Sequence, residues 1–116
     1  MTSSQGDVRD ARRAATAFVA GEWPGADLGA LALVVSELVT NAVCHAGGWW
    51  RLTVRRDGQG FVLDVADHSV ALPSLRPRRL DAVGGHGLSI VRQLFGPLEI
   101  LTGAQGKTVR VRWACG

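Results

Sequence analysis

The chain has 116 residues, of which 47% are hydrophobic and 20% are charged, and its formal net charge is +3. This length corresponds to one domain and excludes a TIM barrel or a two-domain dinucleotide enzyme, which need roughly 200 residues or more. The apolar fraction is too high and the net charge too low for an intrinsically disordered chain.

The first part of the sequence predicts two helices. We expect residues 1–6 to be a disordered N-terminus, and they show neither the basic segment nor the apolar segment of a secretion signal. Apolar residues recur at helical spacing over residues 7–20, and a stretch with glycine and proline ends this pattern. A second helical pattern covers about residues 27–46, with Asp27 as a plausible N-cap and a glycine pair starting at Gly47 as its stop.

The remaining sequence predicts two hairpins. Residues 49–56 and 61–67 flank the turn sequence Asp-Gly-Gln-Gly, and the second of these segments alternates apolar and polar residues. Residues 68–87 show no periodicity, and an unstructured loop of that length in a compact domain suggests a functional role. The last predicted elements are a short helix over 88–95 and a hairpin made of 98–103 and 107–114.

The order of these elements predicts the fold class. We expect residues 7–114 to form a single α+β domain, a two-layer sandwich with helices on one face of a mixed, mostly antiparallel sheet. Cys44 and Cys115 form no CxxC pair, so we expect free thiols in a reducing compartment. No apolar run approaches the ~20 residues of a membrane span, so we expect a soluble, cytoplasmic protein.

Polar residues lie along the edge of the apolar stripe of the second predicted helix. Glu37, Asn41 and His45 are four residues apart and therefore form one row on the helix surface. A carboxylate beside a core costs free energy unless it is satisfied, and asparagine is a poor former of helix interiors. The row is either an ordinary solvated face or a functional one, in which Glu37 polarises a hydroxyl or water and Asn41 gives its oxygen to Mg²⁺.

Two further segments lie at the ends of predicted elements. Asp67 follows an apolar strand, and its acceptor-only carboxylate either binds an amino group such as that of adenine or forms an Asx turn. Gly84, Gly85 and Gly87 precede a predicted helix, where backbone N–H groups can approach phosphate, although a plain turn or hinge also explains them. The chain contains no P-loop pattern.

The order and spacing of these segments resemble the GHKL ATPase superfamily. The matching stretches are SELVTNAVCHA (Ser36–Ala46), Asp67 after a strand, GGHGL (Gly84–Leu88) and GKT (Gly106–Thr108). Within the superfamily, the chain is similar to the small bacterial anti-sigma-factor serine kinases and their stand-alone ATP-binding relatives. The resemblance covers roughly residues 7–114, and the first stretch is its most specific part.

The resemblance implies a histidine-kinase-like ATPase fold, ATP and Mg²⁺ as cofactors, and a role for each matching residue. Glu37 corresponds to the general base that activates the attacking hydroxyl or water. Asn41 corresponds to the Mg²⁺ ligand that also reaches the phosphates. Asp67 corresponds to the acid that binds the adenine amino group, with the Thr108 hydroxyl supporting the adenine site. The residues implied beside the phosphates are Gly85, Gly87 and Leu88.

The resemblance also implies protein partners. We expect the domain to phosphorylate a serine of an anti-sigma-factor antagonist and to restrain a sigma factor, as a monomer or homodimer that contacts neither nucleic acid nor membrane. The alternative is a non-catalytic module of the same fold that sequesters a sigma factor or regulator. The absence of both glycines of the DxGxG adenine box after Asp67 favours this alternative.

A third function class, a basic nucleic-acid binder, has little support. Its candidate residues are arginines in the long loop, but the arginines are scattered along the chain and no DNA-binding helix pair is recognisable. These loop arginines and two histidines therefore have no assigned role: Arg76, Arg78, Arg79, His45 and His86.

Overall fold

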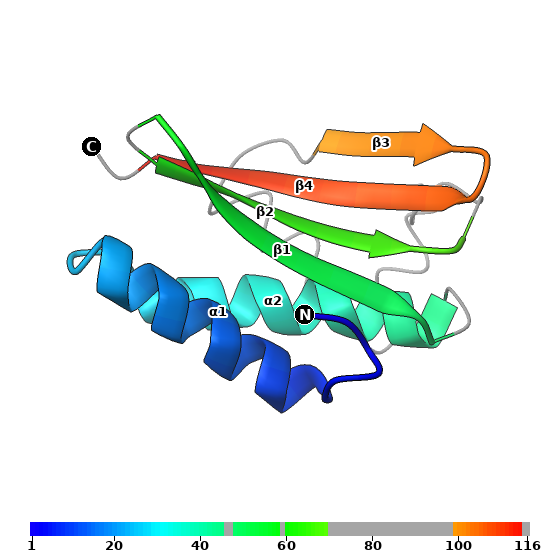
Figure 1. Ribbon diagram of the computed structural model, residues 1–116, viewed down its shortest axis with the longest axis horizontal. Coiled ribbons are helices and arrows are strands. Elements are labelled where there is room, and N and C mark those ends of the chain that lie inside the picture. Colours follow the sequence, from blue (N-terminus) through cyan, green and yellow to red (C-terminus); the bar gives the residue numbers. More distant parts are fainter. Residues whose placement is uncertain (46–47, 59, 70–98, 115–116) are drawn as a thin grey trace, which may run out of the picture.

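The computed structural model describes residues 1–45, 48–58, 60–69 and 99–114, which form two layers (Figure 1). One layer holds the helices α1 (Val8–Glu22) and α2 (Leu28–His45). The other is an open sheet of the strands β1 (Trp50–Asp57), β2 (Gly60–Asp67), β3 (Glu99–Gly103) and β4 (Gly106–Ala114), in the order β1-β2-β4-β3. The predicted α+β two-layer fold is confirmed. All pairings among the described strands are antiparallel, so this part of the sheet is not mixed.

Each helix begins after an aspartate that caps it. Asp7 Oδ1 accepts from the Asp10 backbone N–H at 3.1 Å, and Asp10 Oδ2 accepts from the Asp7 backbone N–H at 2.9 Å. This reciprocal capping box satisfies two donors that a helix start would otherwise leave unpaired. At the second helix, Asp27 Oδ1 accepts from the Ala30 backbone N–H at 3.0 Å, which confirms the predicted N-cap.

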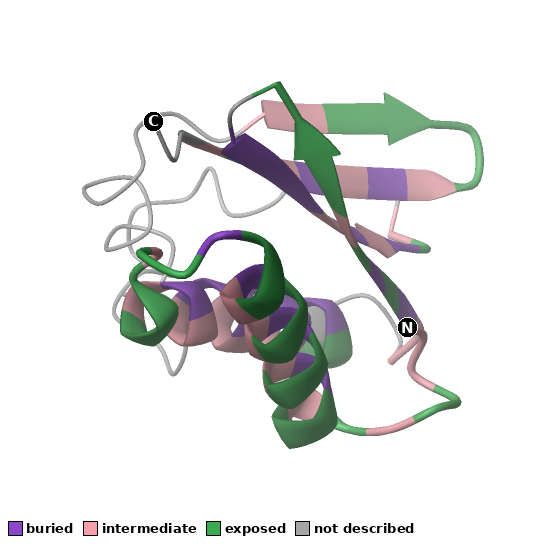
Figure 2. Ribbon diagram, turned by 60° about the vertical axis from the view of Figure 1, so that its left-hand side comes forward, coloured by how far each residue is buried: buried purple, intermediate pink, exposed green. Residues whose placement is uncertain are grey.

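The core lies between the helices and the sheet, where the ribbon of buried residues is purple in Figure 2. Both helices present an apolar stripe to one face of the strands, and burying each larger aliphatic side chain there contributes roughly 1.5–3 kcal/mol. The buried residues of this core are Ala11, Ala15, Val19, Trp23, Leu31, Val34, Val35, Leu38, Val39, Ala42, Trp50, Leu52, Phe61, Leu63, Val65, Val109 and Val111.

The first residues of the chain lie along the outer edge of β1. The Met1 ammonium donates to the Leu52 carbonyl at 3.0 Å, and the Leu52 N–H donates to the Met1 carbonyl at 2.8 Å. The Ser3 N–H donates to the Trp50 carbonyl at 3.0 Å. We expected residues 1–6 to be disordered, but an edge strand has unpaired backbone groups, and this segment supplies partners for some of them.

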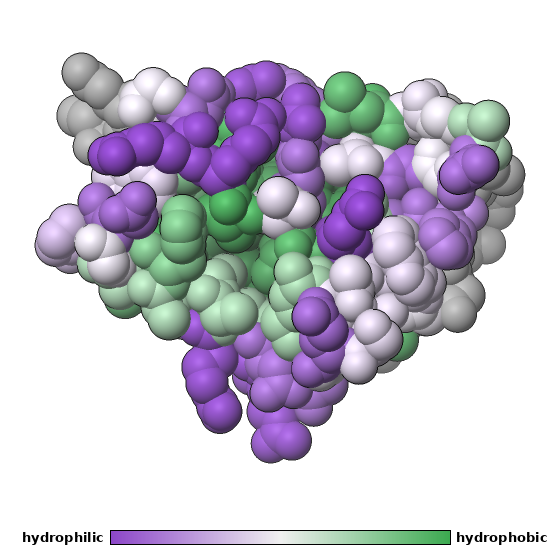
Figure 3. Space-filling model, in the orientation of Figure 1, coloured by the Kyte–Doolittle hydropathy of each residue, from purple (hydrophilic) through white to green (hydrophobic). Residues whose placement is uncertain are grey.

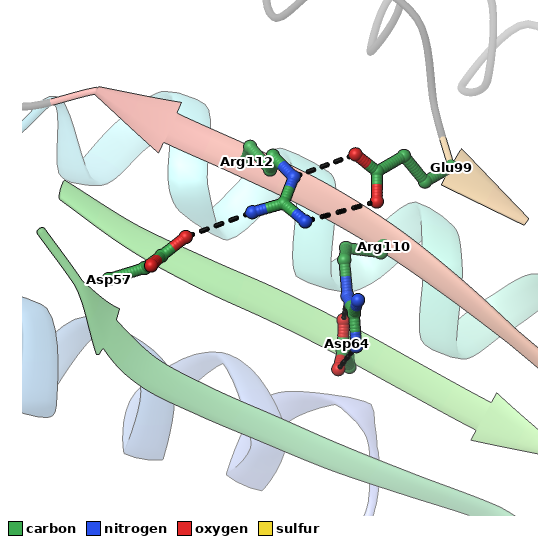
Figure 4. A network of polar contacts seen from close by, with 5 residues as sticks. All are labelled: Asp57, Asp64, Glu99, Arg110 and Arg112. Atoms are coloured by element: carbon green, nitrogen blue, oxygen red, sulfur yellow. Dashed lines mark hydrogen bonds and ion pairs between the residues drawn. The ribbon is translucent and has the colours of Figure 1, made fainter. Parts of the chain in front are cut away.

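The face of the sheet turned away from the helices carries a network of ion pairs (Figure 4). Arg110 holds Asp64 through two hydrogen bonds of 2.8 and 2.9 Å. Arg112 joins Asp57 at 2.9 Å and Glu99 at 2.7 Å, and its hydrogen bond lowers the pKa of the Glu99 carboxyl. The network therefore links all four strands across their open face.

The surface seen from the side of β1 combines polar and apolar regions. Figure 3 shows hydrophobic surface in a band between the sheet and the helices, with hydrophilic side chains above and below it. Partly buried side chains such as Val8 and Val54 pack against the core. Among the described residues, no helix is both long and apolar enough to cross a membrane.

Candidate functional site

Chain segments that are distant in sequence meet at one end of the two layers. The C-terminal end of α2, the end of β2 and the start of β4 lie together there (Figure 1). The strand register places Asp67, the last residue of β2, opposite Trp50 on β1 and opposite Lys107 on β4. Residues directly opposite each other in a sheet share a face. Asp67 therefore lies on the helix-facing side, between a buried tryptophan and a lysine.

Asp67 forms a buried ion pair with Lys107. Its Oδ2 accepts from Lys107 Nζ at 2.8 Å, and the two side chains are only 4% and 7% exposed. Its Oδ1 accepts from the Ser69 backbone N–H at 2.8 Å, which is the Asx turn named above as one of the two interpretations. A buried carboxylate without such partners would cost several kcal/mol. The ammonium group of Lys107 supplies the compensating charge.

Lys107 was not among the predicted site residues, and Thr108 was expected at this place. Successive side chains of a strand point to opposite faces. Lys107 shares the core face with the buried Val109, whereas Thr108 is opposite Ala66 and lies on the open face with Arg110. The structure therefore does not bring Thr108 to Asp67. The GKT motif alone does not reveal which of its residues faces the helices, since this depends on the register between β2 and β4.

Gly106 approaches the end of β2 more closely than any other residue type could. Its φ is 150°, a conformation that residues with a Cβ rarely adopt, and an added Cβ would overlap the carbonyl oxygen of Asp67. The same atom would also lie 3.0 Å from His68 Cα. The first residue of the GKT motif therefore permits the close pairing that brings Lys107 to Asp67.

Glu37 and Asn41 lie on α2, on the half that leads to this end of the molecule. Both side chains are half-buried. At about 100° per residue, they lie about 40° apart around the helix and share one flank. Burial raises the pKa of the Glu37 carboxyl above its ordinary value. A raised carboxyl pKa suits a residue that exchanges protons near neutral pH.

The helix α1 packs on a different flank of α2. Arg12 Nη1 donates to Ser36 Oγ at 3.0 Å, and Ser36 Oγ donates to the Ala32 carbonyl at 2.8 Å. Ser36 lies about 140° from Asn41 around the helix. This contact with α1 therefore does not involve the flank of α2 that carries Glu37 and Asn41.

A stack of rings lies directly beside the ion pair in sequence and in space. The rings of Trp49 and His68 are 4.0 Å apart between centroids and inclined by 12°, and the Arg51 guanidinium lies 5.9 Å from the centre of the Trp49 ring. His68 follows Asp67, and its exposure places this stack at the surface. The stack therefore joins the start of β1 to the segment that leaves β2.

The described residues do not form a metal site by themselves. They contain no group of three or more histidine, cysteine or acidic residues that could hold a metal. Mg²⁺ usually retains several waters and takes one or two protein ligands together with phosphate oxygens. The amide oxygen of Asn41 fits this mode of binding.

The predicted residues that lie outside the described ranges are Gly85, Gly87, Leu88, Arg76, Arg78, Arg79 and His86.

Comparison with known protein families supports a nucleotide-binding fold. A family model described as a histidine kinase-like ATPase domain matches residues 1–113, and the matched range contains Glu37, Asn41, Asp67 and Lys107. The chain matches no protein in the curated set.

Proposed function

Because the chain belongs to the histidine kinase-like ATPase family, we propose that it binds ATP with Mg²⁺ and transfers a phosphoryl group to a serine of another protein. The observation that carries this proposal is the placement of Asp67. Its buried carboxylate ends β2 at the same end of the molecule as the second half of α2, which bears Glu37 and Asn41. A buried acid, an amide and a half-buried acid thus lie toward one end of the domain.

Each of these side chains has a chemical role in the proposal. The oxygens of Asp67 each have two lone pairs, so the carboxylate can accept from a base amino group while it holds Lys107. Asn41 offers its amide oxygen to Mg²⁺, which when bound neutralises charge on the phosphates. Glu37 accepts the proton of the attacking serine hydroxyl, a task for which its raised pKa is suited.

The proposed partners follow from the resemblance of the chain to anti-sigma-factor kinases. The phosphoryl acceptor is an antagonist of an anti-sigma factor, and a sigma factor is the protein whose activity the domain restrains. In this proposal the domain acts in the cytoplasm as a monomer or homodimer and contacts nucleic acid only through its partners.

Nucleotide binding is tested by calorimetric titration of the chain with ATP and Mg²⁺. The wild type is expected to bind at micromolar concentrations, and Asp67→Asn is expected to weaken binding at least about tenfold, since a charged acceptor becomes neutral. The matched control is Asp64→Asn, which removes a charge of the same strand on the open face. No binding by the wild type, or an equal loss in both variants, would contradict the proposed site.

Phosphoryl transfer is tested separately with Glu37→Gln. This variant is expected to bind ATP as the wild type does, while its transfer rate falls by about 10²–10⁴-fold because the proton acceptor is lost. The wild-type rate should rise with pH through the raised pKa of Glu37, since the base must be ionised, and the Gln variant should lack this rise. The control is Glu22→Gln, at the exposed end of α1. Unchanged transfer by Glu37→Gln would exclude Glu37 as the base.

One observation favours the non-catalytic alternative, in which the domain sequesters a sigma factor or regulator. Both oxygens of Asp67 already accept hydrogen bonds, from Lys107 and from the Ser69 amide. A site that is satisfied in this way needs no base to compensate its charge. The phosphoryl-transfer assay separates the two functions, because the sequestering module would bind its protein partner without transferring a phosphoryl group to it.

A further inference from the structure

The first residues of the chain cover only half of the outer edge of β1 (Figure 1). Residues 1–3 pair with Trp50 and Leu52, so the backbone groups of every second residue of β1 point outward. The next two residues of this series are Val54 and Arg56. Within the described ranges, no backbone group pairs with their outward N–H and carbonyl groups. The second half of β1 is therefore a short free edge of the sheet.

The side chains beside this free edge are basic. Arg55 is exposed on the open face of the sheet, and no acidic side chain of the described residues pairs with it. Arg56 is also exposed, and its guanidinium lies 5.4 Å from the centre of the Trp23 ring. Asp57, the next residue, is already bound by Arg112 at 2.9 Å. The free edge therefore carries two positive charges without a described counter-charge.

Apolar side chains lie on the side of the free edge that is turned toward the helices. Val54 is only partly buried and packs against the core. The ring of Phe18, which is 41% exposed, meets the Trp23 ring edge to face at 6.2 Å between centroids. Figure 3 shows hydrophobic surface in the band between the sheet and the helices. A strand added to this edge would therefore direct alternate side chains to apolar surface and to the basic open face.

We propose that the free edge of β1 binds an extended segment of another protein, in which acidic and apolar residues alternate. The segment adds one short strand to the sheet, and its backbone pairs with the outward groups of Val54 and Arg56. Its acidic residues lie on the open face beside Arg55, and its apolar residues lie on the side of the helices. Asp67 pairs with the opposite end of β1, so this interaction surface is separate from the proposed nucleotide site.

A second copy of the chain fits this edge poorly. A symmetric antiparallel pair that uses the outward groups of Val54 and Arg56 is centred on Arg55. Such a pair places the Arg55 side chains of the two copies directly opposite each other. Like charges in this position destabilise a pair of strands. The charge of the edge therefore favours an acidic partner over self-association.

The proposal is tested by NMR titration of the full chain with three blocked synthetic peptides. The first alternates glutamate and valine, the second has lysine in place of each glutamate, and the third is the glutamate peptide with every backbone nitrogen methylated. Only the first is expected to bind, with a Kd of about 1 mM or below and the largest shifts at the amides of Val54 and Arg56. Added salt is expected to weaken this binding, because it screens the attraction between exposed charges.

Two variants locate the contact on the chain. Arg55→Glu reverses the charge beside the edge and is expected to weaken binding of the glutamate peptide at least about tenfold. Val54→Pro removes one outward N–H at a position where an edge strand tolerates proline, and is expected to weaken binding at least about fivefold. The matched control is Arg51→Glu, on the same face of β1 where residues 1–3 already cover the edge. This control is expected to change binding less than about twofold.

The inference would be overturned if the wild type bound none of the peptides, or bound the lysine or the methylated peptide as well as the first. Unchanged binding by Arg55→Glu would also overturn it. Dimers of the free chain in sedimentation, with shifts of the Val54 and Arg56 amides on dilution, would assign the edge to a second copy instead. Circular dichroism verifies that each variant is folded. Because the peptide series uses the wild-type chain, a Val54→Pro variant that fails to fold leaves the inference testable.

Discussion

Replacing Gly106 with alanine is expected to lower the free energy of unfolding by about 2–6 kcal/mol, because two costs add. The backbone conformation, with φ at 150°, is strained for any residue with a Cβ, by roughly 1–3 kcal/mol. The new methyl group overlaps the Asp67 carbonyl oxygen, and inserting a group into a packed site typically costs about 1–3 kcal/mol more. Urea denaturation measures the change.

Alanine variants of two other glycines allow the conformational cost and the steric cost to be measured separately. Gly58 has a φ of 63° with open space around it, so Gly58→Ala is expected to show the conformational cost alone, about 1–2 kcal/mol. Gly21 lies in α1 with open space and no positive φ, so Gly21→Ala is expected to stabilise the domain by about 0.5–1 kcal/mol. The close approach of β4 to β2 would be refuted if Gly106→Ala cost no more than Gly58→Ala.

Removing the buried carboxylate with Asp67→Ala is expected to lower the free energy of unfolding by about 3–5 kcal/mol. The alanine leaves the ammonium of Lys107 without its ion-pair partner inside the domain, where the Lys107 side chain is only 7% exposed. Replacing both residues, as Asp67→Leu with Lys107→Met, is expected to restore most of the loss, since neither charge is then buried. Chemical denaturation of the wild type and the single and double variants measures this coupling.

The open face of the sheet offers the matched control for this ion pair. Asp64 and Arg110 occupy the same two strands and also lie 2.8 Å apart, but their side chains are 16% and 20% exposed. Asp64→Ala is expected to cost about 1 kcal/mol, because water solvates the remaining guanidinium. Equal losses for Asp67→Ala and Asp64→Ala would show that burial of the first pair has no energetic consequence.

The local pattern of the sequence was sufficient for the two helices and four strands among the described residues and for the fold class, while the helix predicted over 88–95 lies outside those residues. The predicted strand segments 61–67 and 107–114 agree with β2 and β4 to within one residue. Alternation of apolar residues and turn glycines determines such segments locally, and the cap at Asp27 depends only on its neighbours. The length excluded large folds, and the order of helices and strands implied two layers, because each apolar face must be covered.

The candidate site was predictable only in part. The sequence pointed to Glu37, Asn41 and Asp67 through residue type and spacing. In the structure, Asp67 lies at the end of the molecule where α2 ends, and the second half of α2 carries the other two residues. The sequence did not reveal that residues 1–3 would lie along β1, because pairing with an edge strand depends on where that edge lies in space.

The sequence by itself determined that this chain is one α+β domain with the acid Glu37, the amide Asn41 and the strand-end carboxylate Asp67 in a fixed order. The tertiary structure alone decided that Lys107, and not Thr108, meets Asp67. The physical reason is the alternation of side chains along a strand. A shift of one residue in the pairing of β2 with β4 would exchange the two faces, and only the packed sheet establishes that register.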